Sequence, residues 1–362
     1  MNVLNVLYDF WPGGVERLAI DVSNELERQG NNAYLCIISE HYSDNLLQQL
    51  DQRVQLIKLV KAAENRKFSY LRQLIRLIDN EKIQVVHVHQ GSLMPFYLLV
   101  KICRPKVKFY FTSHDTYIFS HLSKLNQLLC HLICDKIIAI SDAVVEDIKS
   151  CGISKKQIIR VYNGTDFSRF PVNNRKKHDG PAHIVNIARF FPKKKGQDIL
   201  IEAASLLKEN GYNFRISFAG GETNDSRGSI DAMKEVAKKK QLEKQIVFLG
   251  NVTDIPQLLS TADIFCIPSR YEGFGISAVE AMGTGLPCVA SNVNGLNEVI
   301  NNPKLGELFI TGDSKDLAKK LSKLLDNLDS YNAEFIAENV RRRFSISNMV
   351  KKLLSIYRGE IE

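Results

Sequence analysis

The chain has 362 residues, 44% of them hydrophobic, which is enough for two globular domains with separate cores. No apolar run approaches the roughly 20 residues of a membrane-spanning helix. The amino-terminal NVLNVLYDF lacks the basic segment and the cleavage site of a signal peptide, so we expect a cytoplasmic protein, and the seven scattered cysteines favour reduced thiols. The formal charge of +8 is too small for a nucleic-acid-binding domain and suits small anionic ligands or an anionic membrane surface.

Short apolar runs typical of strands alternate with helical patterns along the whole chain. The first series is VLNVLY, AYLCIIS, VQLIKL, VVHVH, KFYFTS, KIIAIS and IRVYN, and the second is IVNIAR, RISFAG, IVFLG, IFCIP and PCVAS. Apolar strands separated by helices predict parallel sheets in Rossmann-like units. The polar segment NNRKKHDGP at residues 173–181 separates the two series and predicts a linker. We therefore expect an α/β protein with domains at residues 1–170 and 171–345 and a final helix within residues 346–362.

Paired glycines follow the first predicted strand. Gly13 and Gly14, in the segment WPGGVER, stand between that strand and a predicted helix. Backbone N–H groups at such a position can bind a phosphate. The full dinucleotide pattern Gly-x-Gly-x-x-Gly is absent, so an ordinary tight turn is the alternative.

The stretch that begins at Arg66 and ends at Ile78 is basic and amphipathic. On a helical wheel its leucines, isoleucines and Tyr70 fill one half, and Arg72 and Arg76 lie on the other. Two interpretations stay open: a surface helix packed on its own sheet, or a helix that lies on an anionic membrane surface. The more apolar residues 93–102 are expected to belong to the core.

A polar pair, His114 and Asp115, ends the predicted strand KFYFTS. Polar side chains at the carboxyl end of a parallel strand commonly face a ligand, although a lone histidine is more often a structural residue. Cys130 and Cys134 stand one helical turn apart around His131. No second Cys/His pair has the spacing to complete a metal site, so we expect core cysteines.

Basic residues follow the first strand of the second series, in IVNIARFFPKKKGQDILIEA. Arg189 offers a forked guanidinium for a diphosphate, and a lysine of the run before Gly196 offers a point charge. Three lysines in a row are otherwise typical of a solvated turn. Gly220 and Gly250 mark turns after the next two strands.

The most informative stretch is residues 264–298, IFCIPSRYEGFGISAVEAMGTGLPCVASNVNGLNE. A short strand, a loop with Gly273 and Gly275, and a helix from Ile276 expose backbone N–H groups at a helix start, which suits a phosphate. Glu272 and Glu280 bracket this anion site, and carboxylates accept hydrogen bonds from sugar or ribose hydroxyls. The stretch predicts a nucleotide-sugar site, and a pair of solvated surface glutamates is the alternative.

Together these segments resemble glycosyltransferase family 4, the retaining group 1 glycosyltransferases of the GT-B fold. The resemblance rests on E-G-F-G-(x)4-E-A-M-(x)2-G-x-P from Glu272 onward, R-(x)5-K-G at residues 189–196, F-x-G-x-V at residues 248–252 and T-x-H-D at residues 112–115. Ala188 replaces the family's usual glycine before the arginine.

The resemblance implies a GT-B fold, with two Rossmann-like, doubly wound parallel-sheet domains that face a cleft and a last helix that crosses back to the first domain. It implies that Arg189 and Lys195 hold the diphosphate, that Glu272 binds the donor hexose and that His114 lines the reaction centre, as the four catalytic residues. Glu16 and Asp115 would lie on the acceptor side. The implied donor-binding residues are Gly13, Gly14, Gly220, Gly250, Val252, Gly273, Phe274, Gly275, Ile276 and Glu280, the last on the ribose hydroxyls.

By the same resemblance we expect a retaining transferase that moves a hexose from a nucleotide-diphosphate sugar, with UDP preferred, to a glycan or lipid-linked glycan acceptor. Its pathway would be bacterial surface polysaccharide or lipopolysaccharide synthesis. Peripheral attachment to the inner face of the cell membrane through the stretch from Arg66 to Ile78 is one of the two interpretations of that stretch given above. No D-x-D motif is present, so we expect neither a metal nor a cofactor, and no nucleic-acid partner. Two rivals are a GT-B nucleotide-sugar epimerase and a catalytically inactive sugar-nucleotide or lipid-binding scaffold.

Overall fold

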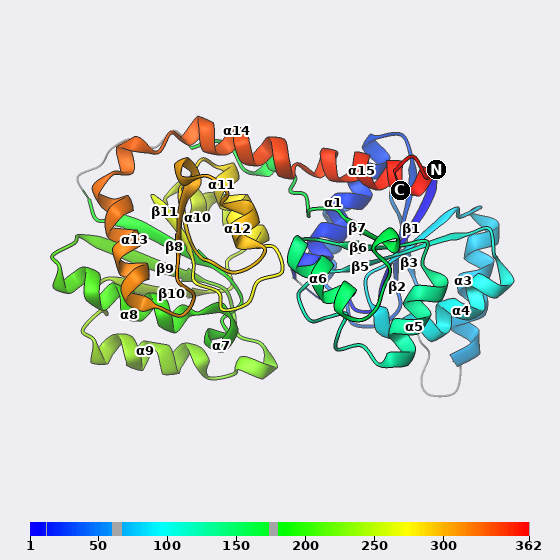
Figure 1. Cartoon of the computed structure of the whole chain (residues 1–362), viewed down its shortest axis with the longest axis horizontal. Helices are drawn as coiled ribbons and strands as arrows, with labels where there is room; N and C mark the ends of the chain where they lie inside the picture. The colour runs from blue at the N-terminus through cyan, green and yellow to red at the C-terminus, as the bar shows by residue number, and fades with distance from the viewer. Residues whose placement is uncertain (12, 60–66, 174–179, 362) are drawn as a thin grey trace. The chain divides into compact units, whose positions relative to one another are not determined.

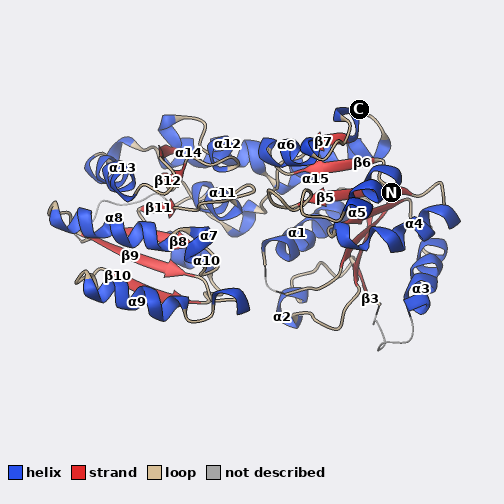
Figure 2. Ribbon diagram, turned by 60° about the horizontal axis from the view of Figure 1, so that its bottom comes forward, coloured by secondary structure: helices blue, strands red, loops and turns tan. Residues whose placement is uncertain are grey.

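The computed structural model describes residues 1–11, 13–59, 67–173 and 180–361, which form two compact units (Figure 1). Unit 1 contains Met1–Thr165 and Ile346–Glu362, and unit 2 contains Asp166–Ser345. Each unit holds one parallel sheet with helices on both faces (Figure 2). No helix in these described ranges is long and apolar enough to cross a membrane.

The sheet of unit 1 has the strand order β3-β2-β1-β4-β5-β6-β7. Its inner strands are buried on both sides, as in β4, where every residue is buried, because helices cover both faces of the sheet. The strands are β1 (Asn2–Leu7), β2 (Asn32–Ile37), β3 (Gln55–Lys58), β4 (Val85–Val88), β5 (Lys108–Ser113), β6 (Lys136–Ala139) and β7 (Ile158–Arg160).

Right-handed crossovers place α1 on one face of this sheet and α3 to α6 on the other. The C-terminal α15 contacts α1, and its Val350, Leu353 and Tyr357 are buried in the same core cluster as Leu18 of α1. The last helix of the chain is thus part of unit 1. The helices of unit 1 are α1 (Gly14–Arg28), α2 (Asp44–Leu47), α3 (Lys67–Asn80), α4 (Met94–Cys103), α5 (Lys124–Ile133), α6 (Asp142–Ser150) and α15 (Ile346–Arg358), with short 3₁₀ turns η1 (Gly91–Leu93) and η2 (Lys155–Gln157).

The sheet of unit 2 has the order β10-β9-β8-β11-β12-β13, with its core between the sheet and helices such as α8 and α13. Its strands are β8 (Ala182–Ile187), β9 (Phe214–Ala219), β10 (Ile246–Gly250), β11 (Ile264–Ile267), β12 (Cys288–Ser291) and β13 (Gly306–Phe309). Its helices are α7 (Pro192–Lys195), α8 (Gln197–Glu209), α9 (Ser229–Lys239), α10 (Ile255–Ser260), α11 (Ile276–Gly283), α12 (Leu296–Val299), α13 (Ser314–Asp326) and α14 (Ala333–Phe344), with 3₁₀ turns η3 (Phe167–Arg169), η4 (Asn224–Ser226), η5 (Pro303–Leu305) and η6 (Leu328–Ser330).

The structure departs from the sequence-based expectations in two places. The strand β13 was not predicted, because GELF is short and begins with glycine. Residues 93–102 do not all belong to the core, since Leu99 and Ile102 of α4 are exposed. For the stretch that contains α3 the sequence left two interpretations open, and the structure supports the packed helix, because Tyr70, Leu74 and Ile78 are buried within unit 1. Most of the expected linker, residues 174–179, and residues 60–66 lie outside the described ranges.

Candidate functional site

The predicted donor residues of unit 2 lie beyond the carboxyl ends of its strands. Chain order reverses between the neighbouring strands β8 and β11, and doubly wound sheets bind their ligands at such a switch point. Arg189 and Lys195 follow β8, and Glu272 follows β11. The topology therefore brings these residues, which are far apart in the sequence, to one end of the sheet.

Lys195 and Glu272 form an ion pair. Lys195 Nζ donates to Glu272 Oε2 at 2.7 Å, and each side chain is only 15% exposed. The Ser269 hydroxyl donates to the same carboxylate oxygen at 3.3 Å. A cation that is held in place and partly shielded from water is well suited to bind a diphosphate. The phosphate oxygens must then compete with the Glu272 carboxylate for the ammonium group of Lys195. The sequence had indicated separate roles for these two residues and not their pairing.

The backbone at Gly196 holds this pair together. Gly196 separates α7 from α8 and has a φ of 69°, in the left-handed region. A Cβ at this position would overlap the carbonyl oxygen of Pro268, directly after β11. Only glycine allows the two loops to approach so closely, which explains why a glycine follows Lys195.

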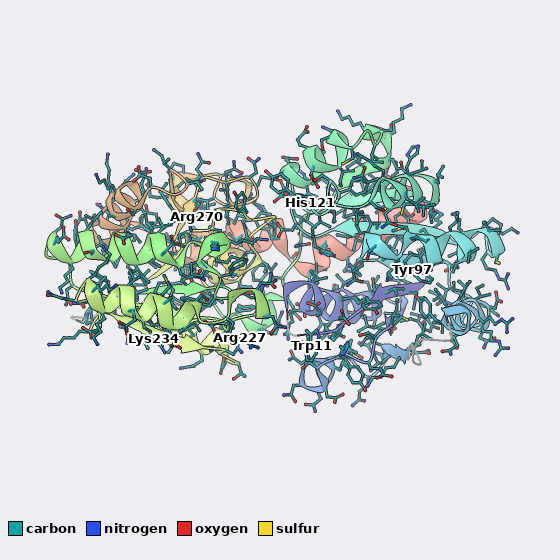
Figure 3. The ribbon with its side chains drawn as sticks, turned by 90° about the horizontal axis from the view of Figure 1, so that it is seen from below. Trp11, Tyr97, His121, Arg227, Lys234 and Arg270 are labelled. Carbon is teal, nitrogen blue, oxygen red and sulfur yellow. The ribbon has the colours of Figure 1, made fainter. Side chains whose placement is uncertain are left out.

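A second link between the two loops was not predicted. Arg270 (Figure 3) donates to both carboxylate oxygens of Asp198 at 2.8 and 2.7 Å and to the carbonyl oxygen of Pro192 at 2.8 Å. Its own backbone N–H donates to the carbonyl oxygen of Lys194 at 2.8 Å. The hydrogen bonds to Asp198 raise the pKa of Arg270. The link fixes the turn that carries Lys195.

The start of α11 is suited to an anion. Gly275 is its N-cap, with a φ of 90°, and neither a side-chain cap nor an acidic residue occupies the first turn. The Ala278 N–H already donates to the Gly275 carbonyl oxygen at 3.0 Å, whereas the N–H groups of Ile276 and Ser277 make no backbone hydrogen bond within the described ranges and suit a phosphate. The buried ring of Phe274 packs edge-on against Phe344, with centroids 5.3 Å apart, and so positions the loop that contains Gly273. Glu280 lies one turn further along the helix and is half-buried.

The other predicted donor residues of unit 2 lie at neighbouring strand ends. Gly220 follows β9 and its N–H donates to the carbonyl oxygen of Gly250, at the end of β10, over 2.7 Å. Val252 follows in the same loop. Arg189 is exposed, and its carbonyl oxygen accepts a hydrogen bond from the buried Gln197 side chain at 3.1 Å. Arg189 thus presents an exposed guanidinium on a backbone that this hydrogen bond holds in place.

In unit 1, a row of histidines marks the ends of β4 and β5. The ring centroids of His87 and His89 are 4.7 Å apart, and those of His89 and His114 are 5.0 Å apart. His87 makes hydrogen bonds of 2.6 Å with the Tyr357 hydroxyl and the Thr112 hydroxyl. His89 Nδ1 and His114 Nε2 are 2.8 Å apart, so one of these rings donates and the other accepts.

This row keeps His114 neutral. Burial, reinforced by His87, lowers the pKa of His114 to about 3, and burial also lowers the pKa values of His87 and His89. His114 Nδ1 is buried without a hydrogen-bond partner among the described residues. Whether that nitrogen donates or accepts depends on which ring of the pair carries the shared proton. His89 was not singled out from the sequence, where the only signal is the alternation VHVH.

An acidic side chain lies against the first glycine loop. Gly13 is the N-cap of α1, and Gly14 begins that helix. A Cβ on Gly13 would overlap the carboxylate of Glu16, so this acidic group lies against the loop. A carboxylate at this position can accept hydrogen bonds from hydroxyl groups. The donor-side role of Gly13 and Gly14 and the acceptor-side role of Glu16 stay predictions. Asp115, beside His114, accepts a hydrogen bond from Thr116 N at 2.9 Å.

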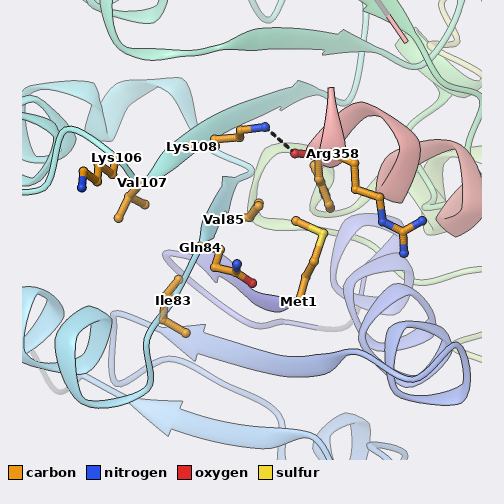
Figure 4. A pocket seen from close by; sticks show the side chains of 9 residues that line it. Met1, Ile83, Gln84, Val85, Lys106, Val107, Lys108 and Arg358 are labelled. Carbon is orange, nitrogen blue, oxygen red and sulfur yellow. Dashed lines mark hydrogen bonds between the residues drawn. The ribbon is translucent and has the colours of Figure 1, made fainter. Parts of the chain in front are cut away.

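A pocket of about 510 Å³ lies at the opposite, amino-terminal edge of the unit 1 sheet (Figure 4). Met1, Gln84 and Lys106 are among the residues that line it, and in its wall Lys108 Nζ donates to the Tyr357 carbonyl oxygen at 2.7 Å. None of the predicted site residues lines this pocket. Within the described parts of the chain, no three His, Cys, Asp or Glu side chains are placed to hold a metal ion.

Two family models match adjoining parts of the chain. Residues 169–343 match the family described as glycosyl transferases group 1, and residues 12–169 match glycosyltransferase family 4. An uncharacterized glycosyltransferase of Haemophilus influenzae is 24% identical over 327 residues, which are 88% of each chain. The capsular polysaccharide biosynthesis glycosyltransferase CapM of Staphylococcus aureus is 27% identical over 237 residues, 61% of this chain and 60% of CapM.

Solved structures share the whole fold. A glycosyltransferase from Rickettsia africae superposes with a TM-score of 0.85 at 22% identity, covering 99% of this chain and 98% of that one. HepE from Anabaena, in complex with UDP, superposes with a TM-score of 0.84 at 18% identity, covering 99% and 100%. These matches confirm the predicted GT-B architecture of two Rossmann-like units. With both of its units matched, the chain belongs to the group 1 glycosyltransferases of the GT-B fold, with a family 4 amino-terminal part.

Proposed function

We propose that this glycosyltransferase is a retaining enzyme that moves a hexose from a UDP-sugar to a glycan or a lipid-linked glycan, in the synthesis of a bacterial surface polysaccharide or lipopolysaccharide. The UDP in the HepE structure supports the choice of nucleotide, and the similarity to CapM, a capsular polysaccharide biosynthesis glycosyltransferase, supports the pathway. The observation that carries the proposal is the placement of Lys195, Glu272 and the uncapped start of α11 at the switch point of unit 2.

Each group has a distinct task in this proposal. Lys195 and Arg189 stabilise the charge that builds on the leaving diphosphate, together with the N–H groups at the start of α11. Glu280 accepts hydrogen bonds from ribose hydroxyls, and Glu272 turns from Lys195 to the hydroxyls of the hexose. His114, held neutral, makes a hydrogen bond at the reaction centre through Nδ1, with Glu16 and Asp115 on the acceptor side.

Positive side chains replace a metal in the proposed reaction. Arg189 and Lys195 carry charge that a divalent ion would otherwise supply to the diphosphate. We expect EDTA to leave turnover unchanged and added Mg²⁺ not to raise it. A loss of activity in EDTA that Mg²⁺ restores would contradict this part of the proposal.

Thermal unfolding with UDP, GDP and ADP tests the donor. Binding to the folded state stabilises a protein by about 2.7 kcal/mol at a ligand concentration one hundred times the Kd, so the cognate nucleotide should raise the Tm most.

Turnover then separates the rivals. A transferase consumes UDP-sugar only with an acceptor and retains the anomeric configuration in its product, an epimerase changes the sugar without an acceptor, and an inactive scaffold binds UDP without turnover.

A further inference from the structure

Three neighbouring helices form one outer layer of unit 1. Successive right-handed crossovers place α3, α4 and α5 on the same face of the sheet, and α4 contacts both of the others. Figure 1 shows α3 and α4 side by side. This layer therefore has one inner side, toward the sheet, and one outer side.

The outer side of α4 and α5 is apolar. On α4, Leu99 is 40% and Ile102 66% exposed, although an ordinary surface helix carries polar residues at such positions. On α5, Leu125, Leu128 and Leu132 are 58%, 52% and 62% exposed, at the spacing of one helix face. These five side chains define what we call the α4–α5 face. Exposed apolar groups gathered in this way are typical of an interaction surface.

The charges around this face are mostly positive. The sequences of α3, α4 and α5 contain five basic residues, and Asp79 is their only acidic residue. Asp79 itself is paired with Arg104, at 2.5 Å. Arg72 and Arg76 are exposed on α3, and Lys124 is exposed at the start of α5. Basic side chains around an apolar face match the negative charge of an anionic lipid surface. They give no advantage with a protein partner of ordinary charge.

We propose that the α4–α5 face docks on an anionic membrane surface, with its leucines and Ile102 among the lipid headgroups and acyl chains and with Arg72, Arg76 and Lys124 on lipid phosphates. The sequence had indicated α3 for the apolar contact, but α3 buries Tyr70 and Leu74 within unit 1. In this assignment α3 supplies charge only, and α4 and α5 supply the apolar contact.

The proposed face also begins near the predicted acceptor residues. Tyr117 and Ile118 are exposed and follow His114 and Asp115 in the chain, and the loop then leads into α5. A lipid-linked acceptor anchored in the membrane under this face would meet the carboxyl edge of the unit 1 sheet. Docking itself needs no activity, whereas this last step rests on the proposed function.

Sedimentation with vesicles tests the docking. The complete chain is mixed with vesicles of phosphatidylcholine, with or without phosphatidylglycerol, at low salt. We expect binding to the anionic vesicles that weakens with added salt and is weak on phosphatidylcholine alone. Ile102→Glu should lower the partition coefficient by about tenfold or more, since it removes apolar contact and adds repulsion. Arg72→Glu with Arg76→Glu should lower it as well, mainly at low salt.

Ile310 of unit 2 offers a matched control, because it is the same residue type with the same 66% exposure as Ile102. Ile310→Glu changes the net charge equally and should leave vesicle binding unchanged. Equal losses in both variants, or no difference between the two kinds of vesicle, would overturn the proposal. So would a dimer in sedimentation velocity that Ile102→Glu dissociates while vesicle binding persists, because the face would then join two copies. The Tm shift with UDP is measured on the same variants. Its absence would contradict the proposed function but not the docking.

Discussion

Among single side chains, Lys195 carries the strongest functional expectation. Its ammonium group is held at 2.7 Å from Glu272, and the turn that carries it is fixed by Gly196 and Arg270. We expect Lys195→Ala to reduce turnover by about 10²- to 10³-fold, the effect of removing one group that stabilises transition-state charge. Lys193→Ala is the matched control, since Lys193 lies in the same short helix but is exposed. Equal rates for the two variants at saturating donor would refute the role of Lys195.

Glu272 and Glu280 should differ in how they affect the free nucleotide. Glu280→Gln should weaken UDP binding by about tenfold, because a charged acceptor for the ribose hydroxyls is replaced by a neutral one. Glu272→Gln should leave UDP affinity equal or higher, since Lys195 loses its carboxylate partner, and yet turnover of the UDP-sugar should fall. Calorimetry with UDP and initial rates with the sugar donor distinguish the two. The opposite pattern would show that the roles are exchanged.

At the level of secondary-structure elements, the start of α11 depends on a single glycine. Gly275 has a φ of 90°, and a Cβ there would overlap Leu296. Gly312 has nearly the same φ, 85°, with nothing within 4 Å of its Cβ position. Gly312→Ala should therefore cost about 1 kcal/mol for backbone strain alone. Gly275→Ala should cost more, through the displaced Leu296, and should also weaken UDP binding. Urea unfolding of both variants measures the difference, and equal losses would show that Leu296 adjusts freely.

The elements also show what a sequence can and cannot predict. Strand runs such as KIIAIS and loop glycines such as Gly275 are local patterns, and they predicted the parallel sheets and the start of α11 correctly. The pairing of Lys195 with Glu272 and of Arg270 with Asp198 depends on which strands are neighbours, and no local pattern contains that information. The same holds for the exposed leucines of α5, because an apolar helix reads as core until its neighbours are known.

For the whole molecule, the histidines of unit 1 make stability depend on pH. Burial holds the pKa values of His87, His89 and His114 below the ordinary value of 6.5, with that of His114 at about 3. As the pH falls below 6.5, the unfolded chain binds protons at these rings and the folded chain does not. The free energy of unfolding should therefore be highest, as far as these histidines are concerned, above pH 6.5. Below that pH it should fall by about 1.4 kcal/mol per pH unit for each such histidine.

The interval from pH 6.5 to about 5 isolates this effect, because most carboxylates titrate lower. Hydrogen exchange of peptides from β4 and β5, corrected for intrinsic rates, reports the stability of unit 1 at each pH. The double variant His89→Asn with His114→Asn removes two of the titrating rings but keeps a polar side chain at each position. Its stability should change less steeply with pH than that of the wild type, with the difference confined to pH values below 6.5. Parallel pH profiles for the two proteins would mean that these histidines already take up protons in the folded state, and His114 would then carry a positive charge at the site.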